Sequence, residues 1–357
     1  MYEKTVSGIM MTLLFIGMFS LAIGVKPAKS TWIGTVYIRA DGSIDPSDAP
    51  IITYDNVTYR LTDNIASFGD GIVVERDNLI IDGADHTLEG TEAYESKGID
   101  LSGRTNVTVQ NTQIKHFYYG ISLYSSSNNS IIGNNIANNE YGIALGYSSN
   151  SIYHNNFIGN AEQVYLEGSY GNVWDDGYPS GGNYWSDYEG TDLFSGSYQN
   201  VTDGDGIGDT SYIIDEDNVD RYPLLGQFNS FNTSVGYSVD VISNSTIEDF
   251  RYFKSNSTIV MHISNMTANQ TAGFCRLTIP HELMQPPYTV KVNGTTIEYM
   301  TIYENYTEGI SIIYFAYEHS RLEITVMPEF PLTILLLAFL MLLTTLIIFI
   351  KKALTST

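Results

Sequence analysis

The chain contains 357 residues, with 40 acidic side chains against 17 lysines and arginines and a formal net charge of −23 at pH 7. This acidic excess disfavours nucleic acid as a partner, because phosphate backbones attract basic surfaces. Cys275 is the one cysteine of the sequence, which excludes a disulfide within the chain.

The first 30 residues have the features of a secretory signal peptide. Lys4 precedes an apolar run at positions 9–25, and Ala28-Lys29-Ser30 then provides small residues suited to cleavage. We expect residues 1–30 to be removed on export; an uncleaved membrane anchor is the alternative. Asn-x-Ser/Thr sequons recur along the chain and fit an exported glycoprotein.

Residues 31–77 are expected to form short β-strands. Positions 35–39 alternate between apolar and polar side chains, and positions 51–61 and 71–75 continue in β fashion. Stacked repeats need a cover over their first turn, because an uncovered turn exposes an open sheet edge. The place of this segment before the repeats predicts an N-terminal β cap.

From about residue 78 the sequence repeats with a period of roughly 22 residues, which is typical of stacked repeats. Gly98-Ile99-Asp100-Leu101 returns at 120–123, 142–145 and 163–166. Three apolar columns recur in register: Ile99/Ile121/Ile143/Val164, Val109/Ile131/Ile152 and Ile114/Ile136/Phe157. One turn is too short to bury its own apolar side, whereas stacked turns form a continuous core.

This pattern predicts an all-β chain with a right-handed parallel β-helix over residues 78–227. A leucine-rich horseshoe is the rival fold, but the leucines that it needs are missing. Paired asparagines at 134–135 and 155–156 suit tight corners. Asparagine tolerates a left-handed backbone there and can form a ladder with its copy one turn away.

After residue 166 the repeat decays into an irregular segment, which we expect to cap the β-helix up to residue 227. The segment is rich in aromatic and acidic side chains. Residues 228–327 then contain alternating segments separated by turns such as Asn293-Gly294. Roughly 100 residues of short strands predict a β-sandwich, placed like a stalk between the β-helix and the membrane.

Residues 331–350 are apolar and uncharged, which is long enough for a helix that spans a bilayer. Lys351 and Lys352 follow, and such positive charges stay on the cytoplasmic side. The sequence therefore predicts a single-pass protein of the cell membrane, with its β domains outside the cell and a cytoplasmic tail unless that tail is processed.

Several motifs together resemble a family of archaeal exported surface proteins with NosD-like right-handed β-helix repeats. They are Tyr37-Ile38-Arg39-Ala40-Asp41-Gly42-Ser43, Val74-Glu75-Arg76-Asp77-Asn78, Gly182-Asn183-Tyr184-Trp185-Ser186-Asp187-Tyr188, the run from Asp203 to Asp209, and Asp220-Arg221-Tyr222-Pro223-Leu224. Pro328-Glu329-Phe330-Pro331 also resembles a PEF-type sorting signal. The resemblance implies possible exchange of the tail for a lipid. It also implies carbohydrate binding or cleavage by the β-helix, and the NosD name comes from copper delivery.

The sharpest candidate metal site is a glycine-rich run of alternate aspartates. Hard cations such as calcium want several oxygen ligands. Asp203, Asp205 and Asp209 would supply carboxylates, Ile207 its backbone carbonyl, and Asp215, or alternatively Asp217, would complete the shell. The spacing departs from that of an EF-hand, and a solvated acidic turn is the alternative.

Aromatic side chains offer the best candidate ligand-binding residues. Their flat amphipathic rings can stack on sugars while their polar atoms hydrogen-bond to hydroxyls. The candidates are Tyr119, Tyr141, Tyr184, Trp185 and Tyr188, and Tyr118 is a neighbouring ring of the same kind. The alternative for Trp185, as for Trp174, is a structural plug at the end of the β-helix.

These features predict an extracellular protein that binds glycans or another cell-surface ligand, without catalysis of its own. The first alternative is a polysaccharide lyase or glycoside hydrolase, for which Glu140 and Glu162 lie one repeat apart. The second is a copper-handling accessory protein. His86, His116 and His154 fall at different repeat phases, so they do not stack into a copper site.

Overall fold

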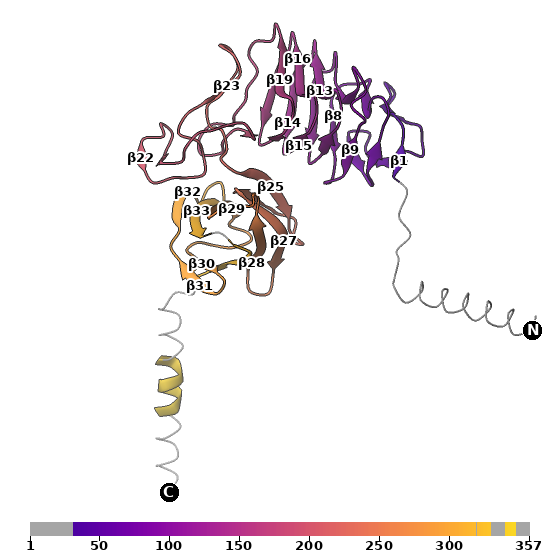
Figure 1. The fold of residues 1–357 in the computed structure, drawn as a ribbon. Coiled ribbons are helices and arrows are strands. Elements are labelled where there is room, and N and C mark those ends of the chain that lie inside the picture. The colour runs from indigo at the N-terminus through magenta and orange to yellow at the C-terminus, as the bar shows by residue number, and fades with distance from the viewer. Residues whose placement is uncertain (1–30, 319, 330–339, 348–357) are drawn as a thin grey trace, which may run out of the picture.

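The computed structural model describes residues 31–318, 320–329 and 340–347. This part of the chain is all-β apart from a helix at residues 340–347 (Figure 1). No helix within the described ranges is long and apolar enough to cross a membrane. The predicted signal peptide lies outside the described residues, as does most of the predicted membrane segment at 331–350.

Residues 32–185 form a parallel β-helix built from three sheets, with successive turns stacked side by side (Figure 1). Sheet A consists of β1 (Trp32–Ile33), β6 (Ile65–Ala66), β9 (Thr87–Glu89), β12 (Gln113–Lys115), β15 (Asn135–Ala137), β18 (Asn156–Ile158) and β20 (Tyr184–Trp185). Sheet B consists of β3 (Ile44–Asp45), β2 (Val36–Ile38), β7 (Ile72–Val74), β10 (Lys97–Asp100), β13 (Tyr119–Tyr124), β16 (Tyr141–Gly146) and β19 (Glu162–Glu167). Sheet C consists of β4 (Ile51–Ile52), β5 (Thr58–Leu61), β8 (Leu79–Asp82), β11 (Val107–Gln110), β14 (Ser127–Ile132) and β17 (Ser149–Tyr153).

The predicted apolar columns run through the centre of these sheets. Ile121 pairs in register with Ile99 on one side and Ile143 on the other, and Ile131 pairs with Val109 and Ile152. All of these side chains are fully buried in one core cluster. The repeat period therefore predicted the strand register, because each turn contacts mainly the turns directly before and after it.

Residues 31–77 build the first turns of the β-helix itself. Strands β1, β2 and β5 pair in parallel with later strands of sheets A, B and C. Strands β3 and β4 pair antiparallel with β2 and β5 at the sheet edges. The predicted cap is thus continuous with the solenoid, because side chains such as Val36 and Ile38 belong to the same core as the repeats.

Buried asparagine ladders hold the corners between the sheets. Asn134 donates to Asn155 across 3.0 Å, and Asn155 donates to Asn183 across 3.1 Å. Asn155 also donates to the backbone carbonyl of Ile131 at 2.7 Å. Buried polar groups need such partners, so the asparagines satisfy corner backbone groups that the strands leave open. Asn134 and Asn155 confirm the ladder expected from the sequence.

Aromatic side chains close the C-terminal end of the β-helix. Trp185 is 1% exposed, and its ring stacks on Phe157 at 4.3 Å and on Tyr212 at 4.3 Å between centroids. Its Nε1 donates to the carboxylate of Asp220 at 2.9 Å. The irregular segment beyond it contains two short hairpins, of β21 (Phe194–Ser195) with β22 (Val201–Thr202) and of β23 (Tyr212–Ile213) with β24 (Val219–Asp220).

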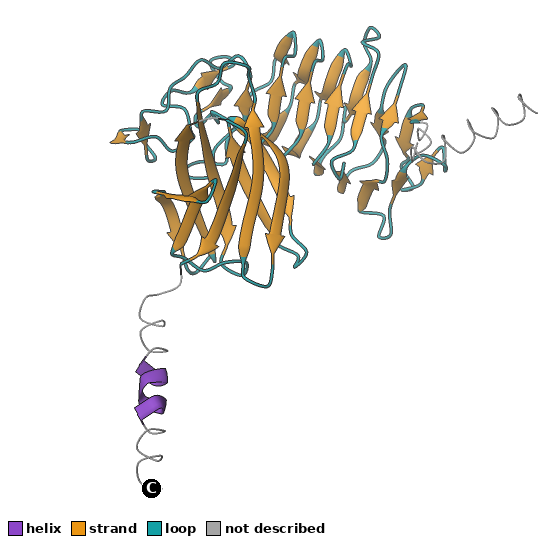
Figure 2. Ribbon diagram, turned by 60° about the horizontal axis from the view of Figure 1, so that its bottom comes forward, coloured by secondary structure: helices purple, strands orange, loops and turns teal. Residues whose placement is uncertain are grey.

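The chain then forms two five-stranded antiparallel sheets, which we call the two-sheet domain (Figure 2). One sheet consists of β25 (Gln227–Asn232), β26 (Ser238–Ser243), β29 (Ala272–Pro280), β33 (Ile310–Glu318) and β32 (Met300–Asn305). The other consists of β27 (Ser245–Phe253), β28 (Thr258–Asn265), β34 (Leu322–Pro328), β30 (Tyr288–Val292) and β31 (Thr295–Ile297). Buried side chains from both sheets, such as Val241 and Ile324, share one core cluster.

The two-sheet domain lies beside the C-terminal end of the β-helix (Figure 1). Phe228 stacks on His154 with 4.4 Å between ring centroids. The backbone N–H and carbonyl of Phe228 bond to the side chain of Asn156, both at 2.8 Å. A paired asparagine of the repeat therefore also joins the two parts of the molecule.

Candidate functional site

Tyrosine side chains gather on the outer face of sheet B. We call Tyr94, Tyr118, Tyr119, Tyr124, Tyr141 and Tyr165 the tyrosine surface. Tyr119 and Tyr141 pair in register on neighbouring strands, and Tyr165 pairs with Ala144 one turn later. The strand register thus places tyrosines from three successive turns next to one another.

Five rings of this surface, all except that of Tyr124, form a chain of direct contacts. The rings of Tyr119 and Tyr141 stack with 5.4 Å between centroids, and Tyr141 meets Tyr165 edge-on at 5.2 Å. Tyr118 contacts Tyr119 at 4.8 Å, and Tyr94 contacts Tyr118 at 5.1 Å. Such pairs prefer offset or edge-to-face geometry, so the rings support one another in a continuous aromatic layer.

A glycine follows Tyr119 and Tyr141 because adjacent turns approach closely there. A Cβ on Gly120 would lie 2.4 Å from the carbonyl oxygen of Gly142, and one on Gly142 would lie 2.6 Å from that of Gln163. Only glycine fits such spacing. The close approach of the turns therefore requires a glycine directly after Tyr119 and directly after Tyr141.

Small residues beneath the rings allow them to lie against the sheet. Ser122 and Ala144 alternate with inward-facing residues, yet both are fully buried. A Cβ on Gly146 would lie 2.1 Å from the ring of Tyr124. The rings of this surface are half-exposed, apart from that of Tyr94, which is 77% exposed.

Three hydroxyls of this layer, those of Tyr119, Tyr124 and Tyr141, are protonated at neutral pH. Burial raises the pKa of Tyr124 to about 12, and burial is also the main cause that raises the pKa of Tyr119 and of Tyr141. A protonated phenol both donates and accepts hydrogen bonds. The layer therefore offers apolar ring faces together with hydroxyls that can pair with a polyol.

The structure brings together two of the five predicted ligand-binding residues, Tyr119 and Tyr141. Trp185 is buried in the plug at the end of the β-helix, as its alternative interpretation had it. Tyr184 packs half-buried at the junction with the two-sheet domain, and the Tyr188 hydroxyl bonds to the carbonyl of Thr210. These three side chains contribute nothing to the tyrosine surface.

Sequence reasoning missed Tyr94, Tyr124 and Tyr165 as members of the surface. For Tyr165 the signal was available, since it follows Ala144 in the same outward column of the repeat. Tyr94 lies in a loop that has no counterpart in later turns, and Tyr124 has Gly146 at its repeat position. The sequence repeat therefore gives no signal for Tyr94 or Tyr124.

The aspartates of the glycine-rich run point to different partners. Asp209 accepts backbone N–H groups of Leu193 and Phe194, both at 3.0 Å. Asp205 is fully buried and accepts the N–H of Ile207 at 3.1 Å. Asp203 is exposed.

Asp215, the fifth predicted ligand, accepts the backbone N–H of Asn218 at 2.8 Å. Within residues 31–318, 320–329 and 340–347, no group of three or more histidine, cysteine, aspartate or glutamate side chains is arranged to hold a metal ion. Calcium binding by this run stays a prediction.

Copper ligands do not converge in the described part of the chain. His116 lies 3.3 Å from Glu89, and His154 bonds to Ser180 at 3.2 Å. His281 bonds to the hydroxyl of Ser311 at 2.8 Å. Cys275 is buried, and burial raises its pKa to about 11, which disfavours the thiolate that copper prefers. The described residues therefore do not fit a copper site.

Residues 39–190 match the family described as periplasmic copper-binding protein (NosD), so the chain contains a NosD-like parallel β-helix. Among solved structures it is similar to full-length tailspike protein 2 from Escherichia coli O157:H7 bacteriophage CAB120, at 10% identity and a TM-score of 0.26. That alignment covers 75% of this chain and 47% of the tailspike chain. No curated protein gives a significant match.

Proposed function

We propose that this chain is an extracellular binding protein that holds a carbohydrate on its tyrosine surface, without catalysis of its own. The observation behind the proposal is the row of contacting rings formed by Tyr119, Tyr141 and Tyr165 on consecutive turns. Flat rings of this kind pair with the apolar faces of sugars, and their hydroxyls bond to sugar hydroxyls. A row of rings that crosses three consecutive strands suits an extended polymer.

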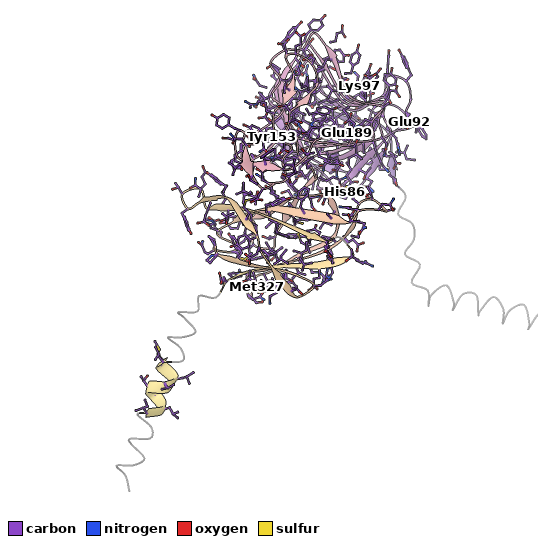
Figure 3. All side chains as sticks on the ribbon, turned by 60° about the vertical axis from the view of Figure 1, so that its left-hand side comes forward. His86, Glu92, Lys97, Tyr153, Glu189 and Met327 are labelled. Carbon is purple, nitrogen blue, oxygen red and sulfur yellow. The ribbon has the colours of Figure 1, made fainter. Side chains whose placement is uncertain are left out.

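The location proposed for this function is the outer side of the cell membrane. The charge pattern of residues 1–30 and the apolar run at 331–350 support export followed by anchoring. The two-sheet domain, a β-sandwich in this proposal, then serves as the stalk. Met327 lies at the end of that domain away from the β-helix (Figure 3), which leaves the tyrosine surface free to face outward.

The test is retention of the purified protein on a glycan array. We expect binding to a defined set of glycans that the double variant Tyr119→Ala/Tyr141→Ala loses. Tyr54→Ala is the matched control, because that tyrosine is 94% exposed and lies outside the tyrosine surface. Binding that survives in the double variant would refute the proposal.

The same experiment separates binding from cleavage. Glu140 and Glu162 lie in adjacent turns, where the backbone N–H of Glu162 donates to the carbonyl of Glu140 at 2.9 Å. If this pair cleaved a polysaccharide, shortened products would appear in the supernatant and Glu162→Gln would stop their release. Retention without products is the result that we expect.

A further inference from the structure

We infer that the tyrosine surface selects glycans carrying protonated amines, namely polymers of unacetylated amino sugars, over neutral glycans and over uronic acid polymers. This inference rests on the proposed carbohydrate-binding function and specifies its ligand class. It follows from where the acidic and basic side chains lie around the rings.

Carboxylates border the tyrosine surface on several sides. Glu162 is in register with Tyr141 on the next strand, and Glu140 directly precedes Tyr141 in the chain. Both carboxylates are exposed. A ligand lying along the rings of Tyr119, Tyr141 and Tyr165 would therefore pass beside two negative charges.

The other edges are acidic as well. Glu167 is in register with Gly146, the residue that the Tyr124 ring covers. Glu95 follows Tyr94 and lies close enough to raise the pKa of that hydroxyl by its charge. Glu95 and Glu167 are exposed, so they too face the solvent from which a glycan would arrive.

Positive charge is scarce on this side of the molecule. The sequence has no lysine or arginine between positions 116 and 220, which includes the last two turns beneath the surface. Lys97 (labelled in Figure 3) is in register with Tyr119, but its Nζ lies 2.5 Å from the carboxylate of Asp100. The Asp100 carboxylate therefore neutralises the positive charge of Lys97, which would otherwise be available to an acidic sugar.

The carboxylates around the rings favour cationic sugars over anionic ones. A uronate on the rings would meet like charges, which repel at short range. A protonated amine would be attracted to the carboxylates and also to the electron-rich faces of the tyrosines. An unacetylated amino sugar combines such an amine with the same sugar ring that stacking requires. Its N-acetylated form has the ring without the charge.

The test compares three probes of similar length by calorimetry at mildly acidic pH and physiological salt. The probes are a chitosan hexamer, an N-acetylated chitin hexamer and an oligogalacturonate. We expect the chitosan hexamer to bind about tenfold more tightly than the chitin hexamer, and the oligogalacturonate to bind more weakly than either. Glu162→Gln/Glu167→Gln should remove most of the chitosan advantage and leave binding of the chitin hexamer unchanged.

Two controls separate a site from general attraction to an acidic protein. Glu189→Gln changes the same kind of charge in the cap, outside the tyrosine surface, and should leave all three affinities unchanged. Tyr119→Ala/Tyr141→Ala keeps the charge and should abolish chitosan binding. Chitosan binding that persists in this tyrosine variant would overturn the inference.

The remaining outcomes distinguish this inference from the proposed function. If the chitosan and chitin hexamers bind equally tightly and the tyrosine variant binds neither, the charge selection is overturned but the proposed binding function stands. Tighter binding of the oligogalacturonate would do the same. Failure to bind any of the three probes or any glycan on the array would refute both.

Discussion

The guanidinium of Arg276, in strand β29 of the two-sheet domain, donates a hydrogen bond of 2.6 Å to the backbone carbonyl of Asp205 in the β-helix cap. It also donates to the carbonyl of Pro179, and the Asp205 carboxylate lies 3.8 Å away. Arg276 is 2% exposed and Asp205 is fully buried. A buried ion pair therefore fastens the two parts of the molecule together.

Replacing Arg276 should loosen this junction. Arg276→Met leaves the Asp205 carboxylate buried without its cation, which typically costs about 3–5 kcal/mol in the free energy of unfolding. Urea unfolding of the purified protein measures the loss. Arg251→Met is the control, because Arg251 pairs with Asp249 at 2.7 Å on the surface, where a pair contributes about 1 kcal/mol or less. Equal losses in the two variants would contradict the role of Arg276.

In sheet C, an aspartate should cost much more stability at an inward position than at an outward position. Ile131 is fully buried between Val109 and Ile152, so Ile131→Asp places an unpaired charge in the core and should cost about 4 kcal/mol or more. Thr108 is half-buried on the outward side of β11, and Thr108→Asp should cost about 1 kcal/mol at most. Circular dichroism melting compares them, and similar melting temperatures would contradict the register.

Stability should rise as the pH falls toward mildly acidic values. Burial raises the pKa of Asp220 from 3.8 to about 7 and that of Asp192 from 3.8 to about 6. The folded state then binds these protons more tightly than the unfolded state does. The stabilisation is complete below about pH 4 and is lost as the pH rises through 6 and 7.

Urea unfolding at pH 5 and pH 8 measures this effect. Asp220 alone contributes up to about 3 kcal/mol in favour of pH 5. Asp220→Asn has no titrating carboxyl, so its stability should change less with pH than that of the unaltered protein. An identical pH dependence in the two proteins would exclude Asp220 as the source.

Calcium binding by the run from Asp203 to Asp209 is testable by melting. If the ion binds the folded protein alone, a hundredfold excess over its dissociation constant stabilises the fold by about 2.7 kcal/mol, and chelator should lower the melting temperature. Asp203→Asn should abolish the difference. Asp205→Ala is unsuitable, because it also removes the partner of Arg276. A melting temperature that chelator does not change would contradict calcium binding by this run.

The β-helix could be predicted from the sequence because its contacts lie one period apart. Ile99, Ile121 and Ile143 recur at equal spacing, and the structure pairs them in that order. Asn134 and Asn155 form their ladder for the same reason. The period also placed Tyr119 against Tyr141, which is the part of the candidate site that follows from sequence.

Only the tertiary structure decided the features that no period describes. Arg276 and Asp205 are 71 residues apart and belong to different parts of the molecule, so nothing in the local sequence relates them. Trp185 lies in the core and not on a binding surface, because its ring covers the last turn of the β-helix. Asp220 accepts the hydrogen bond from its buried N–H. Tyr124 joined the tyrosine surface because Gly146 on the next strand leaves room for its ring. The stacking of the turns depends on residues that lie a fixed number of positions apart in the sequence. The closure of the β-helix end and the docking of the two-sheet domain depend on distant side chains that only folding brings together.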